Sequence, residues 1–304
     1  MDTRINKWSL LIIVVALMFI VASLSSYLIT NTNVASADTI LVIPLNGPIG
    51  IDNGGGDLFS SSTVGVDGII KQLREADKNP NIKAIVLEIN SPGGSAVASA
   101  ELAYTVKTLN KTTYAVIRDV GASGAYWVAT ATDKIIASPM SITGSVGVIS
   151  SYLEFSNLFE KYGIDYERLV AGKYKDMGTP YKELTAEERR IMERKLNDIH
   201  KIFLQDVAVN RKLTQQQINK ISTGEFFLGT EAKELGLVDV LLTKEQAITL
   251  IKQEINQPNA HVVEKKEQTS FLDVLAKQIP LSFGRGFAAE VLDRNNQEMG
   301  IQAR

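Results

Sequence analysis

Strand-like and helix-like segments alternate along the first half of this 304-residue chain. The segments 39–45 (TILVIPL), 82–90 (IKAIVLEIN) and 114–120 (YAVIRDV) are rich in apolar β-branched residues, as buried strands are. Between them, 66–79 and 98–110 carry apolar residues at helical spacing. Strands that alternate with helices join one parallel sheet through helical crossovers. The alternation therefore predicts an α/β fold.

The chain changes character at residue 185. The segment 185–212 opens with a capping-box pair, Thr185 and Glu188, and repeats apolar residues at steps of three and four. This pattern predicts a long amphipathic helix. A further helix is expected to stop at Gly236, because glycine is the common residue just past a helix end.

The N-terminus carries 22 residues without a charge, from Trp8 to Ile29. As a helix they would span roughly 33 Å, about the thickness of a bilayer core. Arg4 and Lys7 precede the run, which predicts a cytoplasmic N-terminus and an extracytoplasmic remainder. A signal peptide cleaved after Ala37 is the alternative, but the run exceeds the usual signal core of about 7–15 residues.

Five segments result from these patterns. Residues 1–7 form a short cytoplasmic N-terminus, 8–30 the transmembrane anchor and 31–38 a linker. Residues 39–255 form the globular domain. Residues 256–304 form a C-terminal extension of mixed, polar composition, which we expect to be partly disordered.

Composition excludes several classes of site. The chain has no cysteine, so thiol catalysis, disulfides and cysteine-based zinc sites are ruled out. A net charge of −2 gives no reason to expect nucleic acid. The two histidines are His200, expected on the solvated face of the long helix, and His261, in the polar extension. No metal or nucleotide motif occurs, and no cofactor is expected.

Two glycine-containing junctions between a strand and a helix carry the candidate chemistry. One is EINSPGGSAVASAEL at 88–102, and the other is RDVGASGAYWVATATDKI at 118–135. Ser123 follows a strand directly, so its hydroxyl would lie near exposed amides and the positive end of a helix dipole. We interpret Ser123 as a nucleophile, with the amides of Gly94 and Gly124 as an oxyanion hole. A helix N-cap and ordinary turn glycines are the structural alternatives.

A nucleophilic serine needs a base, and lysine is an established one. Such a lysine must be partly neutral, although free lysine has a pKa of about 10.4. Lys173 and Lys175 lie in VAGKYKDMGTPYKEL, an unusually apolar context for lysine. Composition alone does not choose between them, and a solvated lysine remains the ordinary alternative.

Four ordered motifs carry a family resemblance. They are NSPGGS at 90–95, ASGAYWVA at 122–129, ITGSVGV at 142–148 and GKYKDMGTPY at 172–181. Together, behind one apolar N-terminal run, they closely resemble the signal peptide peptidase A family of membrane-anchored serine proteases with a Ser-Lys dyad. The resemblance covers roughly residues 38–245 and indicates a single-repeat short form.

The resemblance implies a crotonase/Clp-protease-like fold and assigns roles to residues. Ser123 would be the nucleophile, and the motif selects Lys175 over Lys173 as the base. Ser145 would support the lysine amine, and Gly94 and Gly124 match the oxyanion-hole positions. The family often has Gly-Gly after the nucleophile, whereas this chain has Gly124 followed by alanine, a mild departure that leaves the Gly124 amide available.

The resemblance also implies a function. The enzyme would degrade signal-peptide remnants left in the membrane, with its catalytic domain held outside the cytoplasm by residues 8–30. The resemblance to short members of the family further implies a homo-oligomeric ring, in which the lysine of one subunit reaches the serine of a neighbouring subunit.

Three other functions are compatible with parts of the sequence. A membrane protease of the type encoded beside stomatin-like proteins shares the Ser-Pro-Gly-Gly loop, but the Gly-Lys-Tyr-Lys motif argues against it. An inactive membrane scaffold would have no need to retain Ser123, Ser145 and Lys175 together. A crotonase acting on acyl thioesters has no use for an exported domain.

Overall fold

The computed structural model describes residues 17–18, 38–51 and 64–265 of the chain. The predicted anchor at 8–30, apart from Leu17 and Met18, and the extension beyond Lys265 lie outside the described residues. Within the described ranges, no helix has the length and apolar character needed to cross a bilayer.

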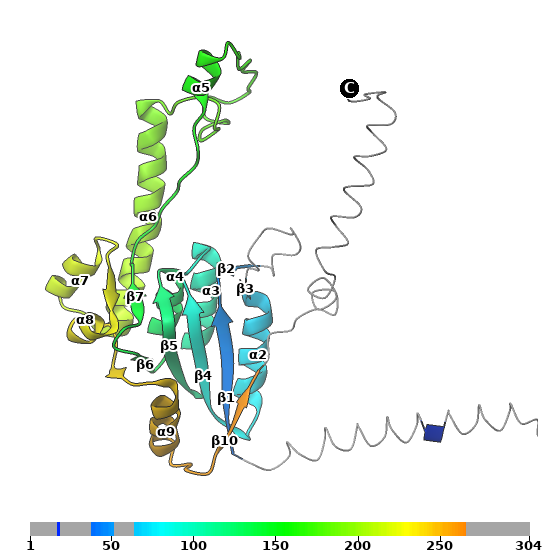
Figure 1. Ribbon diagram of the computed structural model, residues 1–304, viewed down its shortest axis with the longest axis vertical. Helices are drawn as coiled ribbons and strands as arrows, with labels where there is room; N and C mark the ends of the chain where they lie inside the picture. Colours follow the sequence, from blue (N-terminus) through cyan, green and yellow to red (C-terminus); the bar gives the residue numbers. More distant parts are fainter. Residues whose placement is uncertain (1–16, 19–37, 52–63, 266–304) are drawn as a thin grey trace, which may run out of the picture. The chain divides into compact units, whose positions relative to one another are not determined.

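The elements alternate in the order predicted for an α/β fold (Figure 1). The strands are β1 (Thr39–Asn46), β2 (Ile49–Gly50), β3 (Val64–Gly65), β4 (Ile82–Ser91), β5 (Thr112–Ala122), β6 (Lys134–Ala137), β7 (Ile142–Gly144), β8 (Phe226–Leu228), β9 (Val240–Leu241) and β10 (His261–Glu264). The helices are α2 (Val66–Lys78), α3 (Ala96–Lys107), α4 (Gly124–Thr130), α5 (Ser156–Lys161), α6 (Ala186–Arg211), α7 (Gln215–Ile221), α8 (Gly229–Glu234) and α9 (Lys244–Glu254).

One eight-stranded sheet organises the domain, with the order β10-β1-β4-β5-β6-β9. β7 pairs with the end of β5, and β8 pairs with β7. Every pairing is parallel except β7 with β8. The prediction of a mixed α/β fold with a parallel sheet is therefore confirmed. The short strands β2 and β3 form a separate parallel pair.

The central strands are buried on both faces, which explains their continuous apolar character. Along β1, Leu41 and Ile43 point into the larger core, which also receives side chains from α2, α3, α4 and α6. Ile40 and Val42 point to the opposite face, where they pack with residues of α9. The sheet is therefore covered on one face by α2, α3, α4 and α6 and on the other by α9.

The sheet continues past residue 255. β10 pairs in parallel with β1, with His261 opposite Thr39, and so becomes an edge strand (Figure 1). His261, expected in a polar extension, is part of this strand and is exposed.

The long helix α6 matches its prediction closely, including the reciprocal capping box of Thr185 and Glu188. In the C-terminal half of α6, Phe203 stacks on Trp127 of α4, with ring centroids 4.6 Å apart. Its N-terminal half leads away from the sheet (Figure 1). There it meets residues 150–185, which we call the arm and which include α5.

Candidate active site

Ser123 stands at a sharp junction between β5 and α4. Its backbone lies in the left-handed region, with φ of 54°, which is uncommon for a residue other than glycine. The neighbouring strand β7 helps to fix this geometry, because the Ser123 amide donates to the Gly144 carbonyl at 2.8 Å. A serine held on a strained turn between strand and helix is the arrangement of the nucleophile in α/β-hydrolases. The side chain is half-buried, so it keeps access to solvent.

The Ser-Pro-Gly-Gly loop after β4 packs directly against this junction. A Cβ placed on Gly93 would lie 2.6 Å from the Gly124 amide nitrogen, and one on Gly94 would lie 2.1 Å from the Ile49 carbonyl oxygen. Gly93 also has φ of 96°. These positions exclude side chains because backbone approaches backbone there. The loop can come this close to Ser123 only because positions 93 and 94 are glycine.

The amides of Gly94 and Gly124 are available for a ligand. Neither donates a hydrogen bond to another of the described residues. A Cβ on Gly124 would lie 3.4 Å from the Gly94 nitrogen, so the two glycines are neighbours. Two free amides beside a serine hydroxyl can stabilise the negative oxygen of a tetrahedral intermediate. Ala125, where the family often has glycine, is fully buried and accommodates its methyl group in the core.

Ser145 lies beside Ser123 because of the register of the sheet. Ala122 on β5 is opposite Gly144 on β7, so the next residue of each strand is a serine at the same edge. Ser145 also has positive φ, 52°, and its amide donates to the Glu225 carbonyl at 2.9 Å. The structure therefore brings together four of the five predicted residues.

Lys175 is the fifth predicted residue, and within a single chain it lies apart from the other four. It lies in the arm, in a turn that packs at the N-terminal end of α6. Phe203, which stacks on Trp127 of α4, is 17 residues from Ala186, or about 26 Å along the helix axis. Within the described ranges, the polar side chains of the arm bond only to one another and to the first turn of α6.

The surroundings of the two candidate lysines differ. The Lys173 amine donates to Glu187 at 2.6 Å, and this hydrogen bond raises the pKa of Lys173 above its usual range. A base needs its neutral form, so Lys173 is poorly suited to that role. The Lys175 amine, by contrast, has neither a hydrogen bond nor an ion pair with any described residue, and its side chain is exposed.

His200 does not lie on a solvated face as expected. It is half-buried, and its Nε2 is 3.0 Å from the carbonyl oxygen of Val146, one residue after Ser145. The expectation was wrong because this turn of α6 faces the loop after β7. Helical periodicity identifies the apolar stripe of a helix but not a polar neighbour brought in by another strand.

Two further residues shape the site and were not singled out from sequence. The Thr143 hydroxyl donates to the Gly121 carbonyl at 2.7 Å and ties β7 to β5 just below the two serines. Ser99 of α3 is fully buried, and its hydroxyl has no partner among the described residues. It stands beneath Gly124, whose added Cβ would lie 2.2 Å from the Ser99 oxygen. No local pattern in the sequence distinguishes Ser99 from the other residues of α3.

In the part of the chain that the structure describes, no group of histidines and carboxylates is placed to hold a metal ion. The groups that the structure brings together at the site are the Ser123 hydroxyl, the two glycine amides and a second serine.

Comparison with known proteins gives consistent results. Residues 106–257, half of the chain, match Peptidase family S49, and residues 61–143 match Clp protease. The chain is 34% identical over 266 residues to the putative protease MJ0651 of Methanocaldococcus jannaschii, an alignment that covers 86% of this chain and 85% of that one. It is 32% identical over 239 residues to the putative signal peptide peptidase SppA of Enterococcus faecium, covering 78% and 69% respectively.

Among solved structures, the fold is similar to that of the 1510-N membrane-bound stomatin-specific protease, in a serine-to-alanine mutant. The TM-score is 0.50, and the match covers 77% of this chain and all of the other. At 12% identity this likeness concerns the fold alone.

Proposed function

Because the chain belongs to peptidase family S49 and is therefore a peptidase, we propose that it is a membrane-anchored serine endopeptidase with a Ser-Lys dyad. The predicted family is thus confirmed. In this proposal Ser123 attacks the peptide bond, Lys175 is the general base, and Ser145 supports the lysine amine. The observation that carries the proposal is Ser123 itself, held with positive φ beside two amides that donate to none of the other described residues.

The proposed reaction uses only groups of the protein. The neutral amine of Lys175 takes the proton of the Ser123 hydroxyl as the oxygen bonds to the substrate carbonyl carbon. The amides of Gly94 and Gly124 bind the resulting oxyanion. When the peptide C–N bond breaks, the ammonium returns the proton to the leaving amine. Water then hydrolyses the acyl-enzyme by the same proton transfers, which restores the free serine.

We propose that each site takes its lysine from a neighbouring subunit. Two observations support this: Lys175 lies at the far end of α6 from Ser123, and the arm that carries it exposes large apolar side chains. Those most exposed are Leu153 (74%), Tyr162 (69%), Ile164 (53%) and Leu169 (89%). Such a surface is costly in water and is typical of a buried contact. A head-to-tail ring would cover the arm and complete each site.

The proposed substrates are apolar signal-peptide remnants in the membrane. One of the relatives is named a putative signal peptide peptidase, which supports this substrate class. The apolar run at 8–30 supports a membrane location with an extracytoplasmic catalytic domain, because it would hold the site where such remnants concentrate. A stomatin-type substrate is the alternative, and membership in a peptidase family argues against the scaffold hypothesis.

The test uses the full chain in detergent or in vesicles, with an apolar signal-like peptide and a polar peptide of equal length as substrates. We expect Ser123→Ala and Lys175→Ala to lower kcat by about 10³-fold or more, while Lys173→Ala retains most of its activity. Preference for the polar peptide would contradict the substrate class, and cleavage of a stomatin-like protein alone would favour the alternative. Full activity of Lys175→Ala would refute the assigned base.

Mixing the two inactive variants tests the shared site. If Ser123→Ala and Lys175→Ala subunits reassemble in equal amounts, an intact serine meets an intact lysine at about one site in four of a head-to-tail ring. Recovery of about one quarter of the wild-type activity is therefore expected. No recovery, in mixed assemblies verified by mass, would show that the dyad forms within one subunit.

A further inference from the structure

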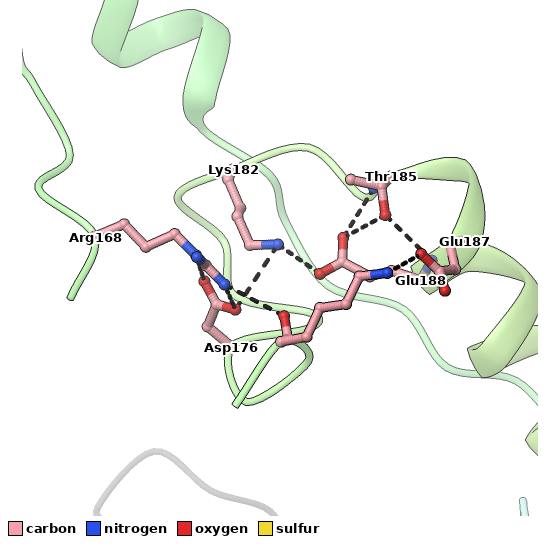
Figure 2. A network of polar contacts seen from close by, with 7 residues as sticks. Arg168, Asp176, Lys182, Thr185, Glu187 and Glu188 are labelled. Carbon is pink, nitrogen blue, oxygen red and sulfur yellow. Dashed lines mark hydrogen bonds and ion pairs between the residues drawn. The ribbon is translucent and has the colours of Figure 1, made fainter. Parts of the chain in front are cut away.

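The residues on both sides of Lys175 are bonded to the rest of the arm or to α6, whereas the amine of Lys175 bonds to no residue in the ranges that the structure describes. On one side, the Tyr174 hydroxyl hydrogen-bonds to Glu187 in the first turn of α6. On the other side, Asp176 binds Arg168 (Figure 2). The turn that carries Lys175 is therefore held at both ends.

Asp176 is the centre of this network. Arg168 donates to both of its carboxylate oxygens, from Nε at 2.5 Å and from Nη2 at 2.8 Å, in the planar fork that arginine forms with carboxylates. The amine of Lys182 lies 4.0 Å from the same carboxylate. The hydrogen bonds from Arg168 lower the pKa of Asp176 to about 2. Asp176 is consequently ionised at any pH at which the enzyme would be assayed.

The contacts continue from Asp176 to the start of α6. Lys182 donates to Glu188 at 2.7 Å, and the other oxygen of Glu188 accepts from the amide and the hydroxyl of Thr185, both at 2.9 Å (Figure 2). Glu188 is 4% exposed, so this end of the network is buried. The capping box therefore does more than begin a helix, because it anchors the ion pairs of the lysine turn to a rigid element.

From this arrangement we propose that Asp176, held by Arg168 and Lys182, is a positioning residue that fixes the turn carrying Lys175 on the end of α6. The inference rests on the proposed function of Lys175. Because the Lys175 amine has no partner among the described residues of its own chain, a base that must enter another subunit depends on its sequence neighbours for its direction. Catalytic groups need their geometry fixed to within a fraction of an ångström, which a free loop does not provide.

The ordinary alternative is that these are exposed ion pairs of little consequence, since most surface pairs contribute almost nothing. Two features distinguish the network from such pairs: the two-point fork at Asp176 and the buried Glu188 at its end. A matched control is available in Asp38, which pairs with Lys83 at 3.2 Å at the opposite end of the sheet.

The experiment compares Asp176→Asn, Asp176→Glu, Arg168→Gln and the control Asp38→Asn in the assembled full chain. The measurements are kcat and KM on the apolar peptide, together with the oligomer mass. We expect Asp176→Asn and Arg168→Gln to lower kcat by roughly 10–100-fold with KM and oligomer mass unchanged. Asp176→Glu, which keeps the charge, should recover most of kcat, and Asp38→Asn should match the wild type.

Two results would overturn the inference. Wild-type kcat in both Asp176→Asn and Arg168→Gln would mean that the network is an ordinary surface feature. Loss of oligomer mass in step with activity, with no rescue by glutamate, would mean that the role is only structural. Lys175→Ala, measured in parallel, distinguishes failure of this inference from failure of the proposed function. If Lys175→Ala is active, Lys175 is not the base and the proposed function fails, whatever the Asp176 variants show.

Discussion

Gly124 has no room for a side chain, and Ser99 is the reason. A methyl group at position 124 would lie 2.2 Å from the Ser99 hydroxyl oxygen and 3.0 Å from the Ser99 Cβ. Favourable contacts between such atoms begin near about 3.5 Å. Gly124→Ala must therefore move the peptide whose amide we assign to the oxyanion hole, or move α3.

The expected loss follows from these distances. The Ser99 hydroxyl can rotate away, but its Cβ cannot move without α3, so a displacement of about 0.5 Å or more remains. Removal of one oxyanion donor costs about 10²–10³-fold in kcat, and a shift of about 1 Å costs a comparable factor. We expect Gly124→Ala to lower kcat by about 10²-fold and to lower the free energy of unfolding by about 1–3 kcal/mol, because the added methyl group overpacks a buried contact.

Substitution of Ser99 should restore activity in steps. Ser99→Ala removes only the oxygen and leaves the contact at 3.0 Å, whereas Ser99→Gly removes both atoms. In the Gly124→Ala background, the first should recover part of kcat and the second most of it. Ser99→Ala alone should cost little stability, because the hydroxyl it removes is buried without a partner among the described residues.

The assay measures kcat and KM for the three single variants and the two double variants, with thermal unfolding to confirm the fold. Full kcat in Gly124→Ala would refute the steric argument. Failure of both Ser99 substitutions to recover any activity would also refute it, because the remaining contact of position 124, 3.4 Å from the Gly94 nitrogen, is ordinary.

Three other predictions concern the framework of the site. Gly94→Ala should abolish activity and lower the melting temperature, because its Cβ would lie 2.1 Å from the backbone oxygen of Ile49, which no rotation can relieve; activity and thermal unfolding measure this. Phe203→Ala should lower the free energy of unfolding by about 3–5 kcal/mol in denaturant titration, since the ring is 2% exposed. Burial raises the pKa of Asp239, but hydrogen bonds from Arg211 and from a backbone amide outweigh this and leave it below its usual range. A carboxylate with a depressed pKa stabilises the fold above its unfolded pKa of about 4 and loses this as pH falls, so Asp239→Asn should cost about 1–3 kcal/mol at neutral pH and progressively less in acid.

Local patterns predicted the elements with good accuracy. The reciprocal side chains of Thr185 and Glu188 placed the start of α6, and the apolar runs placed β1, β4 and β5. These features depend on residues within a few positions of one another. The two glycine-containing junctions were found for the same reason, because each strand, turn and helix start is written in a single short segment.

Long-range contacts were not predicted from local patterns. The antiparallel strand β8 beside β7, the edge strand β10 and the bond from His200 to Val146 each join segments far apart in the sequence. Ser99 looked like an ordinary helix residue, and only the packing of α3 beneath Gly124 gives it a role. Periodicity indicates which face of an element is buried but not which element covers it.

The same distinction between local patterns and long-range contacts applies to the candidate site. The sequence by itself determined which residue types are present: a serine between small residues, glycines that free the backbone amides, and two lysines in one motif. Tertiary structure decided which of them meet, because the parallel register of β4, β5 and β7 aligns the ends of three strands at one edge. It also decided that Lys175 lies apart from Ser123, since a long helix fixed at one end by Phe203 carries the lysine turn at the other.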